Sequence, residues 1–248
     1  MPFLFLVSVF MDFRYFDKKL DANRGRWYTF SDLLLLIQLF MKEKIFNNLV
    51  DGIEVRVCFS DICVMNAEAC VVPQFSNRVA DTGVAATLLH SGFSRGVLEY
   101  GELFERYKAK ALPLGSAFIT NAYTGGYAWL IHVPVLDAES FEVYDAAMFA
   151  VYAALHEADR LNLYDIVIPA LCTGHKGLLS FKQSAKAMLT ALKSFRSEHD
   201  TLREIKFVIS KNEAAYQEFV SFVENNFDEV PVISGLEESY LQITEVYR

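Results

Sequence analysis

Apolar and polar residues change their spacing repeatedly along this chain, and from residue 53 onward the change is regular. Short apolar runs predict strands at residues 53–59, 69–73, 116–123, 128–135, 165–170 and 205–210. Between them, apolar residues recur every three or four positions, which predicts helices at residues 84–91, 98–110, 146–161, 182–195 and 213–226. This alternation predicts a three-layer α/β domain with helices on both faces of a largely buried sheet.

The first 52 residues follow a different pattern and are expected to form a hydrophobic N-terminal extension. Residues 2–11 are strongly apolar but lack the basic start and cleavage site of a signal peptide, so a strand is expected there. The apolar run 33–41 is shorter than the roughly 20 residues that a bilayer span requires. Ser31 is typical of an N-cap, and a nearly all-apolar helix is expected from there to about Asn47. Such a helix must pack on the core or on a second copy of the chain.

The last twenty or so residues are expected to form a tail. A Ser-Gly pair at 234–235 predicts a turn, and the alternating stretch 240–246 predicts an added edge strand. The predicted organisation is therefore an extension over residues 1–52 packed on the core, a domain over residues 53–228, and a tail over residues 229–248.

Composition narrows the class of protein. Apolar residues make up 53% of the 248 residues, which is enough for a substantial core. Lys and Arg number 23 against 31 Asp and Glu, giving a formal charge of −8 without a long basic run, so neither a nucleic-acid nor a membrane partner is indicated. The four cysteines form no CxxC pair, which favours reduced thiols in a cytoplasmic protein. The five histidines lack metal-ligand spacing, so no metal is expected; His132, inside an apolar run, is expected to be a core histidine.

Two glycine-containing loops carry the clearest functional signal. Residues 81–86 are Asp-Thr-Gly-Val-Ala-Ala, and residues 172–177 are Cys-Thr-Gly-His-Lys-Gly. Each loop follows a predicted strand and precedes a predicted helix, the arrangement in which backbone N–H groups at a helix N-terminus bind an anion. Glycine lets phosphate oxygens approach the backbone and tolerates a positive φ. Two such loops are suited to clamp a diphosphate.

The stretch from residue 53 to about residue 226 resembles the macro domain, a family of ADP-ribose-binding α/β modules. The family's Gly-Asp-Ile-Thr, and its Asp-Ala-Ile-Val-Asn seven positions further on, correspond to Ser60-Asp61-Ile62-Cys63 and Glu68-Ala69-Cys70-Val71-Val72. Its Gly-Gly-Val helix start, Gly-Glu-Ala strand entry, Ile-His strand and phosphate-loop strand correspond to Thr82-Gly83-Val84, Gly115-Ser116-Ala117, Ile131-His132 and Ile168-Pro169-Ala170-Leu171-Cys172-Thr173-Gly174. The resemblance implies a three-layer α/β/α macro-like fold with a mixed central sheet and N- and C-terminal additions.

The resemblance also implies roles for residues on both sides of a bound nucleotide. Asp61 would accept a hydrogen bond from the adenine amino group, because an ionised carboxylate is acceptor-only, with the Ile62 backbone near the base. The alternative for Asp61 is a turn-stabilising aspartate after a strand. The diphosphate and distal ribose would contact the backbone and hydroxyl groups of the two glycine loops: Thr82, Gly83, Val84, Ala85, Thr173, Gly174, His175, Lys176 and Gly177. The side chains of His175 and Lys176 either add charge or are merely solvated.

Two polar positions used by hydrolytic members of the family are replaced in this chain. The family's Asn-Ala-Ala-Asn, whose last Asn contacts the distal ribose, is here Val72-Pro73-Gln74-Phe75, and the Asp that follows Gly-Gly-Val is here Ala85. Phe75 would form an apolar wall at the distal ribose. The polar residues close enough in sequence to supply the ribose contact instead are Gln74, Asn77 and Asp81. No catalytic residue is therefore assigned.

Binding of ADP-ribose or a close derivative, without a further cofactor, is the function that the resemblance implies. Two alternatives stay open. One is a hydrolase that removes ADP-ribose or an acyl group from an ADP-ribosyl adduct, which turnover of such a substrate would reveal. The other is an assembly or sensor module in which residues 1–52 mediate contacts, including homo-oligomer contacts, that the nucleotide regulates.

Overall fold

The computed structural model describes residues 42–50, 52–123, 126–138, 142–174, 178–195, 199–210 and 212–244. Its strands are β1 (Lys42–Val50), β2 (Ile53–Phe59), β3 (Ala69–Gln74), β4 (Phe118–Asn121), β5 (Trp129–Pro134), β6 (Asp165–Pro169) and β7 (Glu204–Ile209). Its helices are α4 (Gly83–His90), α5 (Ser94–Arg106), α6 (Val143–Arg160), α7 (Phe181–Ser194), α8 (Glu213–Asn226) and α9 (Leu236–Thr244), with short 3-10 helices η1 (Ile62–Val64) and η2 (Phe227–Glu229). The strand expected at residues 2–11 lies outside the described residues.

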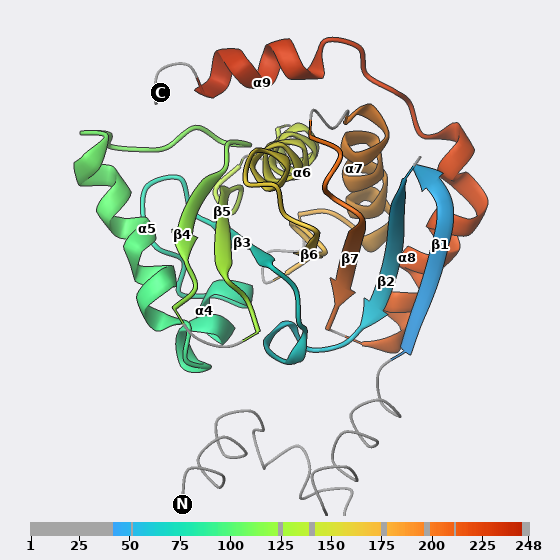
Figure 1. Ribbon diagram of the computed structural model, residues 1–248, viewed down its shortest axis with the longest axis horizontal. Coiled ribbons are helices and arrows are strands. Elements are labelled where there is room, and N and C mark those ends of the chain that lie inside the picture. Colours follow the sequence, from blue (N-terminus) through green and yellow to red (C-terminus); the bar gives the residue numbers. More distant parts are fainter. Residues whose placement is uncertain are drawn as a thin grey trace, which may run out of the picture. The chain divides into compact units, whose positions relative to one another are not determined.

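The described strands form one mixed sheet in the order β1-β2-β7-β6-β3-β5-β4 (Figure 1). Parallel pairing joins β2, β7, β6, β3 and β5, whereas β4 runs antiparallel to β5. Helices α6, α7 and α8 pack on one another, and α4 and α5 pack together against β3, β4 and β5. The predicted α/β architecture, a mixed sheet with helices on both faces, is confirmed.

In strands β2 and β7, buried apolar residues alternate with partly exposed charged residues, so one face of these strands packs against the core formed with α6, α7 and α8. In β2, Val55 and Val57 are fully buried in the core formed with α6, α7 and α8, whereas the intervening residues Glu54 and Arg56 point to the opposite face. The same alternation in β7 places Phe207 in the core. No helix in the described part of the chain is long and apolar enough to cross a membrane.

The prediction of a helix up to Asn47 is wrong for its last six residues, which belong to β1; residues 31–41 lie outside the described residues. Phe46, Leu49 and Val50 pack against the core. They stand at positions i, i+3 and i+4, a spacing that would also place them on one face of a helix. In the fold, pairing with β2 across the turn at Gly52 outweighs this local pattern. Lys44, which pairs with Glu224, gives the edge strand the charge that discourages pairing with another chain.

The edge strand predicted for residues 240–246 is also wrong, because the described part of that stretch belongs to α9. Leu236 and Tyr240, four residues apart, are both buried, and this spacing is helical. The Tyr240 ring packs 5.9 Å from the Tyr152 ring and 4.9 Å from the His156 ring, so α9 lies against α6. The contact with α6 selects the helix over the strand.

Candidate ligand-binding site

A cavity of about 600 Å³ lies at the carboxyl ends of strands β3, β6 and β7. Ligands of open α/β sheets bind at this edge because the connecting loops and helix N-termini converge there. Its lining is mainly apolar, and Asp61 is the one charged side chain among the described residues that line it. Among the described residues, the groups that could bind an anion in this cavity are therefore chiefly backbone N–H groups and hydroxyls.

Most of the residues predicted from the sequence lie against this cavity. Those that line it are Asp61, Ile62, Phe75, Thr82, Gly83, Val84, Thr173 and Gly174. Ala85 is fully buried and Asn77 is exposed, and neither lines the cavity. His175, Lys176 and Gly177 lie outside the described residues.

The first glycine loop opens helix α4 at the cavity. The first backbone hydrogen bond of the helix joins Ala86 N to Thr82 O at 3.4 Å, so the N–H groups of Gly83, Val84 and Ala85 have no intrahelical acceptor. The Thr82 side chain makes no capping hydrogen bond to them. Gly83 has a φ of +58°, a conformation that disfavours any side chain. The loop thus presents unpaired donors and the positive end of a helix dipole to the cavity.

The second loop connects β6 to α7, and its described residues Thr173, Gly174 and Leu178 also line the cavity. Leu179 N donates to Cys172 O at 3.1 Å, and the Thr173 hydroxyl donates to Ala170 O at 2.9 Å, so the base of the loop is closed by the chain itself. Apart from its chain neighbours, a Cβ atom placed on Gly174 would meet no atom of the described residues within 4 Å. The space beside Gly174 is therefore open to a ligand.

Asp61 stabilises the turn that begins η1 and also lines the cavity. One carboxylate oxygen, Oδ1, accepts a hydrogen bond from Cys63 N at 2.8 Å and caps η1, which is the turn-stabilising role. The residue is nevertheless exposed and lines the cavity. Ile62 is buried, and its carbonyl oxygen accepts a hydrogen bond from the Tyr127 hydroxyl at 2.5 Å. The segment around η1 is thus fixed while a carboxylate faces the cavity.

Phe75 forms an apolar part of the cavity wall directly after β3. The residue is 8% exposed, and its carbonyl oxygen accepts a hydrogen bond from the Tyr100 hydroxyl at 2.9 Å. The guanidinium carbon of Arg78 lies 3.7 Å from the centre of the Phe75 ring, a cation–π contact that helps to hold the ring. Asp81, the other polar neighbour considered for the ribose, is exposed and does not line the cavity.

Gln74 is fully buried, belongs to a chain of side-chain hydrogen bonds, and does not line the cavity. Its Oε1 accepts from Ala80 N at 2.7 Å, and its Nε2 donates to His132 Nδ1 at 3.1 Å. The ring proton of His132 therefore lies on Nε2, which donates to Thr120 Oγ1 at 2.8 Å, and the Thr120 hydroxyl donates to Gly96 O at 2.9 Å. Burial lowers the pKa of His132 to about 3. The prediction of a satisfied core histidine is confirmed.

The cysteines and acidic residues offer no metal centre within the described ranges. None of the four cysteines is in a disulfide in the described part of the chain, and Cys58, Cys70 and Cys172 are buried. Burial raises the pKa of Cys172, which lines the cavity, to about 12, so this thiol is not a ready nucleophile. Among the residues that can be placed, no three His, Cys, Asp or Glu side chains gather to hold a metal ion.

Sequence reasoning missed the apolar lining that surrounds the two loops. The missed residues, apolar except for Thr87 and Ser210, are Pro73, Thr87, Val135, Leu136, Pro169, Ala170, Leu178, Phe181, Val208, Ile209 and Ser210. Most of them end a strand or follow one, so the common signal is position at the carboxyl end of a predicted parallel strand. Phe181, the first residue of α7, is an aromatic side chain at the cavity.

A family model described as Macro domain matches residues 76–188. An uncharacterized protein of Pyrobaculum aerophilum is 30% identical over 173 residues, which cover 69% of this chain and 91% of that protein. An uncharacterized protein of Saccharolobus solfataricus is 28% identical over 163 residues, covering 66% of this chain and 89% of that protein.

Solved structures share the fold at lower sequence identity. The Oceanobacillus iheyensis macrodomain with ADP superposes with a TM-score of 0.66 at 15% identity, covering 77% of this chain and 99% of that one. A mutant of that macrodomain with ADPR gives a TM-score of 0.66 at 17% identity, covering 75% of this chain and all (100%) of that one. The Trypanosoma brucei macrodomain in complex with ADP gives 0.59 at 13% identity, covering 88% and 85% of the two chains.

Proposed function

Because this chain belongs to the macro domain family, whose members bind ADP-ribose, we propose that it binds ADP-ribose or a close derivative in the cavity at the carboxyl edge of its sheet. The observation that carries the proposal is the start of α4, where unpaired backbone N–H groups meet a cavity that Gly174, with open space beside it, also lines. A diphosphate suits this arrangement, since backbone donors hold an anion without basic side chains. Calorimetry with ADP-ribose, with AMP and NAD as controls, tests the proposal.

In this proposal the ligand extends along the strand ends from η1 to Phe75. The base lies near Asp61, whose second carboxylate oxygen accepts from the 6-amino group of adenine. The diphosphate lies between Gly83 and Gly174, within reach of the α4 N-terminus. The distal ribose lies against Phe75, an apolar surface that contributes contact area without a hydrogen bond. Val208 and Ile209, the aliphatic end of β7, supply apolar contact for the base in place of an aromatic ring.

Substitution of Asp61 is expected to weaken ADP-ribose binding. Asp61→Ala should raise the dissociation constant by an amount equivalent to about 1–3 kcal/mol, the range for losing a charge-assisted hydrogen bond. Part of that loss reflects the cap on Cys63 N, which alanine also removes. Asp61→Asn separates the two roles, because its amide oxygen can keep the cap while the charge is lost. Unchanged affinity in both variants, measured by calorimetry, would remove the assignment of Asp61 to the base.

Little or no release of ADP-ribose from a mono-ADP-ribosylated protein is expected. Phe75 and Ala85 stand where hydrolytic relatives carry polar groups, and the Gln74 amide is engaged in the buried chain of hydrogen bonds. Efficient catalysis of this kind needs a positioned base or water, and Asp61 lies at the opposite, base-reading end of the proposed ligand. The measurement is release of labelled ADP-ribose over hours. Fast release would contradict the expectation, and His175 would then be the next residue to substitute.

A further inference from the structure

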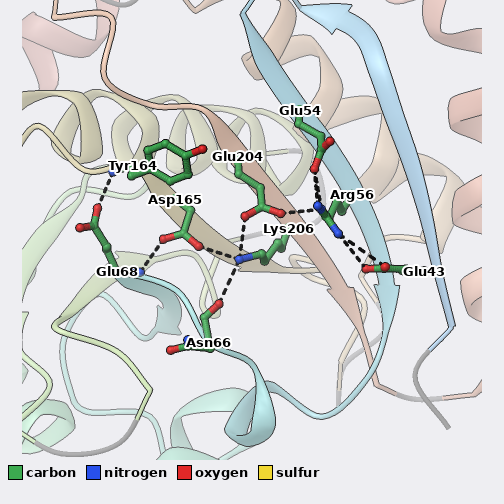
Figure 2. A network of polar contacts seen from close by, with 9 residues as sticks. All are labelled: Glu43, Glu54, Arg56, Asn66, Glu68, Tyr164, Asp165, Glu204 and Lys206. Atoms are coloured by element: carbon green, nitrogen blue, oxygen red, sulfur yellow. Dashed lines mark hydrogen bonds and ion pairs between the residues drawn. The ribbon is translucent and has the colours of Figure 1, made fainter. Parts of the chain in front are cut away.

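Charged side chains form a network at the start of strands β2, β6 and β7 (Figure 2). Glu54 pairs in register with Glu204, and Arg56 with Lys206, so all four project from the sheet face opposite the α6–α8 core. The side chains of Lys206 and Glu204 are 14% and 15% exposed, respectively, whereas that of Arg56 is 28% exposed. Lys206 is thus the more enclosed of the two cations.

The Lys206 ammonium group uses its three N–H donors on three acceptors. Its Nζ lies 2.6 Å from Asp165 Oδ2, 2.9 Å from Glu204 Oε2 and 3.0 Å from the backbone oxygen of Asn66. The carboxylates lie on neighbouring strands of the sheet. Asn66 instead belongs to the segment that crosses from β2 to β3, so this lysine connects the sheet to a loop (Figure 2).

The crossing segment, residues 60–68, contains η1 and, directly before it, Asp61, so it includes both residues assigned to the base. At one end, Ser60 N donates to Ile209 O at 3.3 Å. At the other end, Glu68 N donates to Asp165 Oδ1 at 2.8 Å, and Asn66 O accepts from Lys206. The same Asp165 carboxylate thus holds Lys206 with one oxygen and the segment with the other. Backbone hydrogen bonds from Ala67 N to Gly126 O and from Trp129 N to Glu68 O hold the same half of the segment, and Lys206 and Asp165 add side-chain anchors to it.

We propose that Lys206 is a positioning residue for base recognition, acting through the crossing segment on Asp61 and Ile62. The inference rests on the proposed function. Without the ammonium group, Asn66 O loses its donor and Asp165 loses its neutralising charge, so residues 66–68 keep fewer anchors and the position of Asp61 is less closely fixed. The diphosphate loops are closed by other contacts, Ala86 N to Thr82 O and Leu179 N to Cys172 O. The loss therefore falls on the base end of the ligand rather than on the diphosphate.

The test compares Lys206→Met with a matched variant, Arg56→Met. Both remove one cation from the same network, but within the described residues Arg56 forms ion pairs with Glu43, Glu54 and Glu204, none of them in the crossing segment. Calorimetry measures the affinity of each variant for ADP-ribose and for its hypoxanthine analogue, which has a carbonyl in place of the 6-amino group. We expect the wild type and Arg56→Met to prefer adenine by about tenfold, and Lys206→Met to prefer it by less than about threefold.

Each outcome bears on the inference. If Lys206→Met keeps the wild-type preference for adenine, the inference is wrong. If Arg56→Met loses as much of this preference as Lys206→Met does, the inference is also wrong, because the effect then belongs to the network as a whole. If Lys206→Met does not fold, Asp165→Asn tests the same link, because it removes the charge that holds Lys206, and retained base preference there overturns the inference. A wild type that binds neither ligand overturns the proposed function, and the inference with it. Wild-type binding without base preference overturns the inference while leaving nucleotide binding intact.

Discussion

The Gly174→Val variant is expected to lose at least about 100-fold in affinity for ADP-ribose while keeping the thermal stability of the wild type. Apart from its chain neighbours, a Cβ atom on Gly174 meets no atom of the described residues within 4 Å, and this glycine is not among those with a positive φ. Valine therefore costs the folded protein little. It does fill the space in which the diphosphate would approach the loop, so the effect appears in binding alone.

Two further variants turn this expectation into a graded test. Gly174→Ala adds one methyl group and should cause a smaller loss of affinity than valine. Gly83→Val should lose stability as well as binding, because Gly83 has a φ of +58° and a side chain in that region costs roughly 1–2 kcal/mol. Calorimetry and thermal unfolding measure both quantities. Wild-type binding by Gly174→Val would place the diphosphate elsewhere.

Acidification is expected to destabilise the protein through His132. Burial lowers the pKa of this residue to about 3 in the folded chain, against an ordinary value of 6.5. Between these two pH values the unfolded chain binds a proton that the native chain does not, so the free energy of unfolding falls as pH falls. From pH 7 to pH 4.5 the loss should be about 2–3 kcal/mol, two pKa units at about 1.36 kcal/mol each.

The variant His132→Gln isolates this contribution, because glutamine can hydrogen-bond to Gln74 and Thr120 but does not titrate. We expect the variant to be less stable than the wild type at pH 7 and to lose less stability on acidification. Chemical denaturation at several pH values measures both slopes. Equal slopes would mean that His132 is not the group that takes up the proton. The carboxylates contribute equally to both proteins, so they cancel in the comparison.

The local sequence pattern was sufficient to predict the bounds of elements that have capping residues or a clear periodicity. The predicted strand at residues 53–59 and the predicted helix at residues 213–226 coincide with β2 and α8. Asn212 caps α8 by accepting from Ala215 N, and Ser180 opens α7 with a capping box that includes Gln183. Where such caps are present, the boundary is set by residues adjacent in sequence. The confirmed α/β architecture follows from the same periodicities.

Local pattern failed where contact with a distant element chose between two conformations. The residues of β1 have a spacing compatible with a helix, yet β2 supplies a partner for an extended chain. Residues 240–244 alternate like a strand, yet α6 supplies an apolar surface for Tyr240 in a helix. In both cases the competing partner lies outside any local window. Propensity is a weak prior, and tertiary packing overrides it.

The sequence by itself determined the alternation of strands and helices, the family resemblance, and the placement of two glycine loops after strands, because each depends on residues a few positions apart. Only the tertiary structure decided what surrounds those loops. The position of Gln74 in the sequence is compatible with a contact to the ribose. In the structure, its side-chain amide instead hydrogen-bonds to His132, 58 positions away, in the interior. Lys206 reaches Asn66 across 140 positions. Hydrogen-bond partners so far apart leave no periodic trace in the chain, since the sheet alone brings them together.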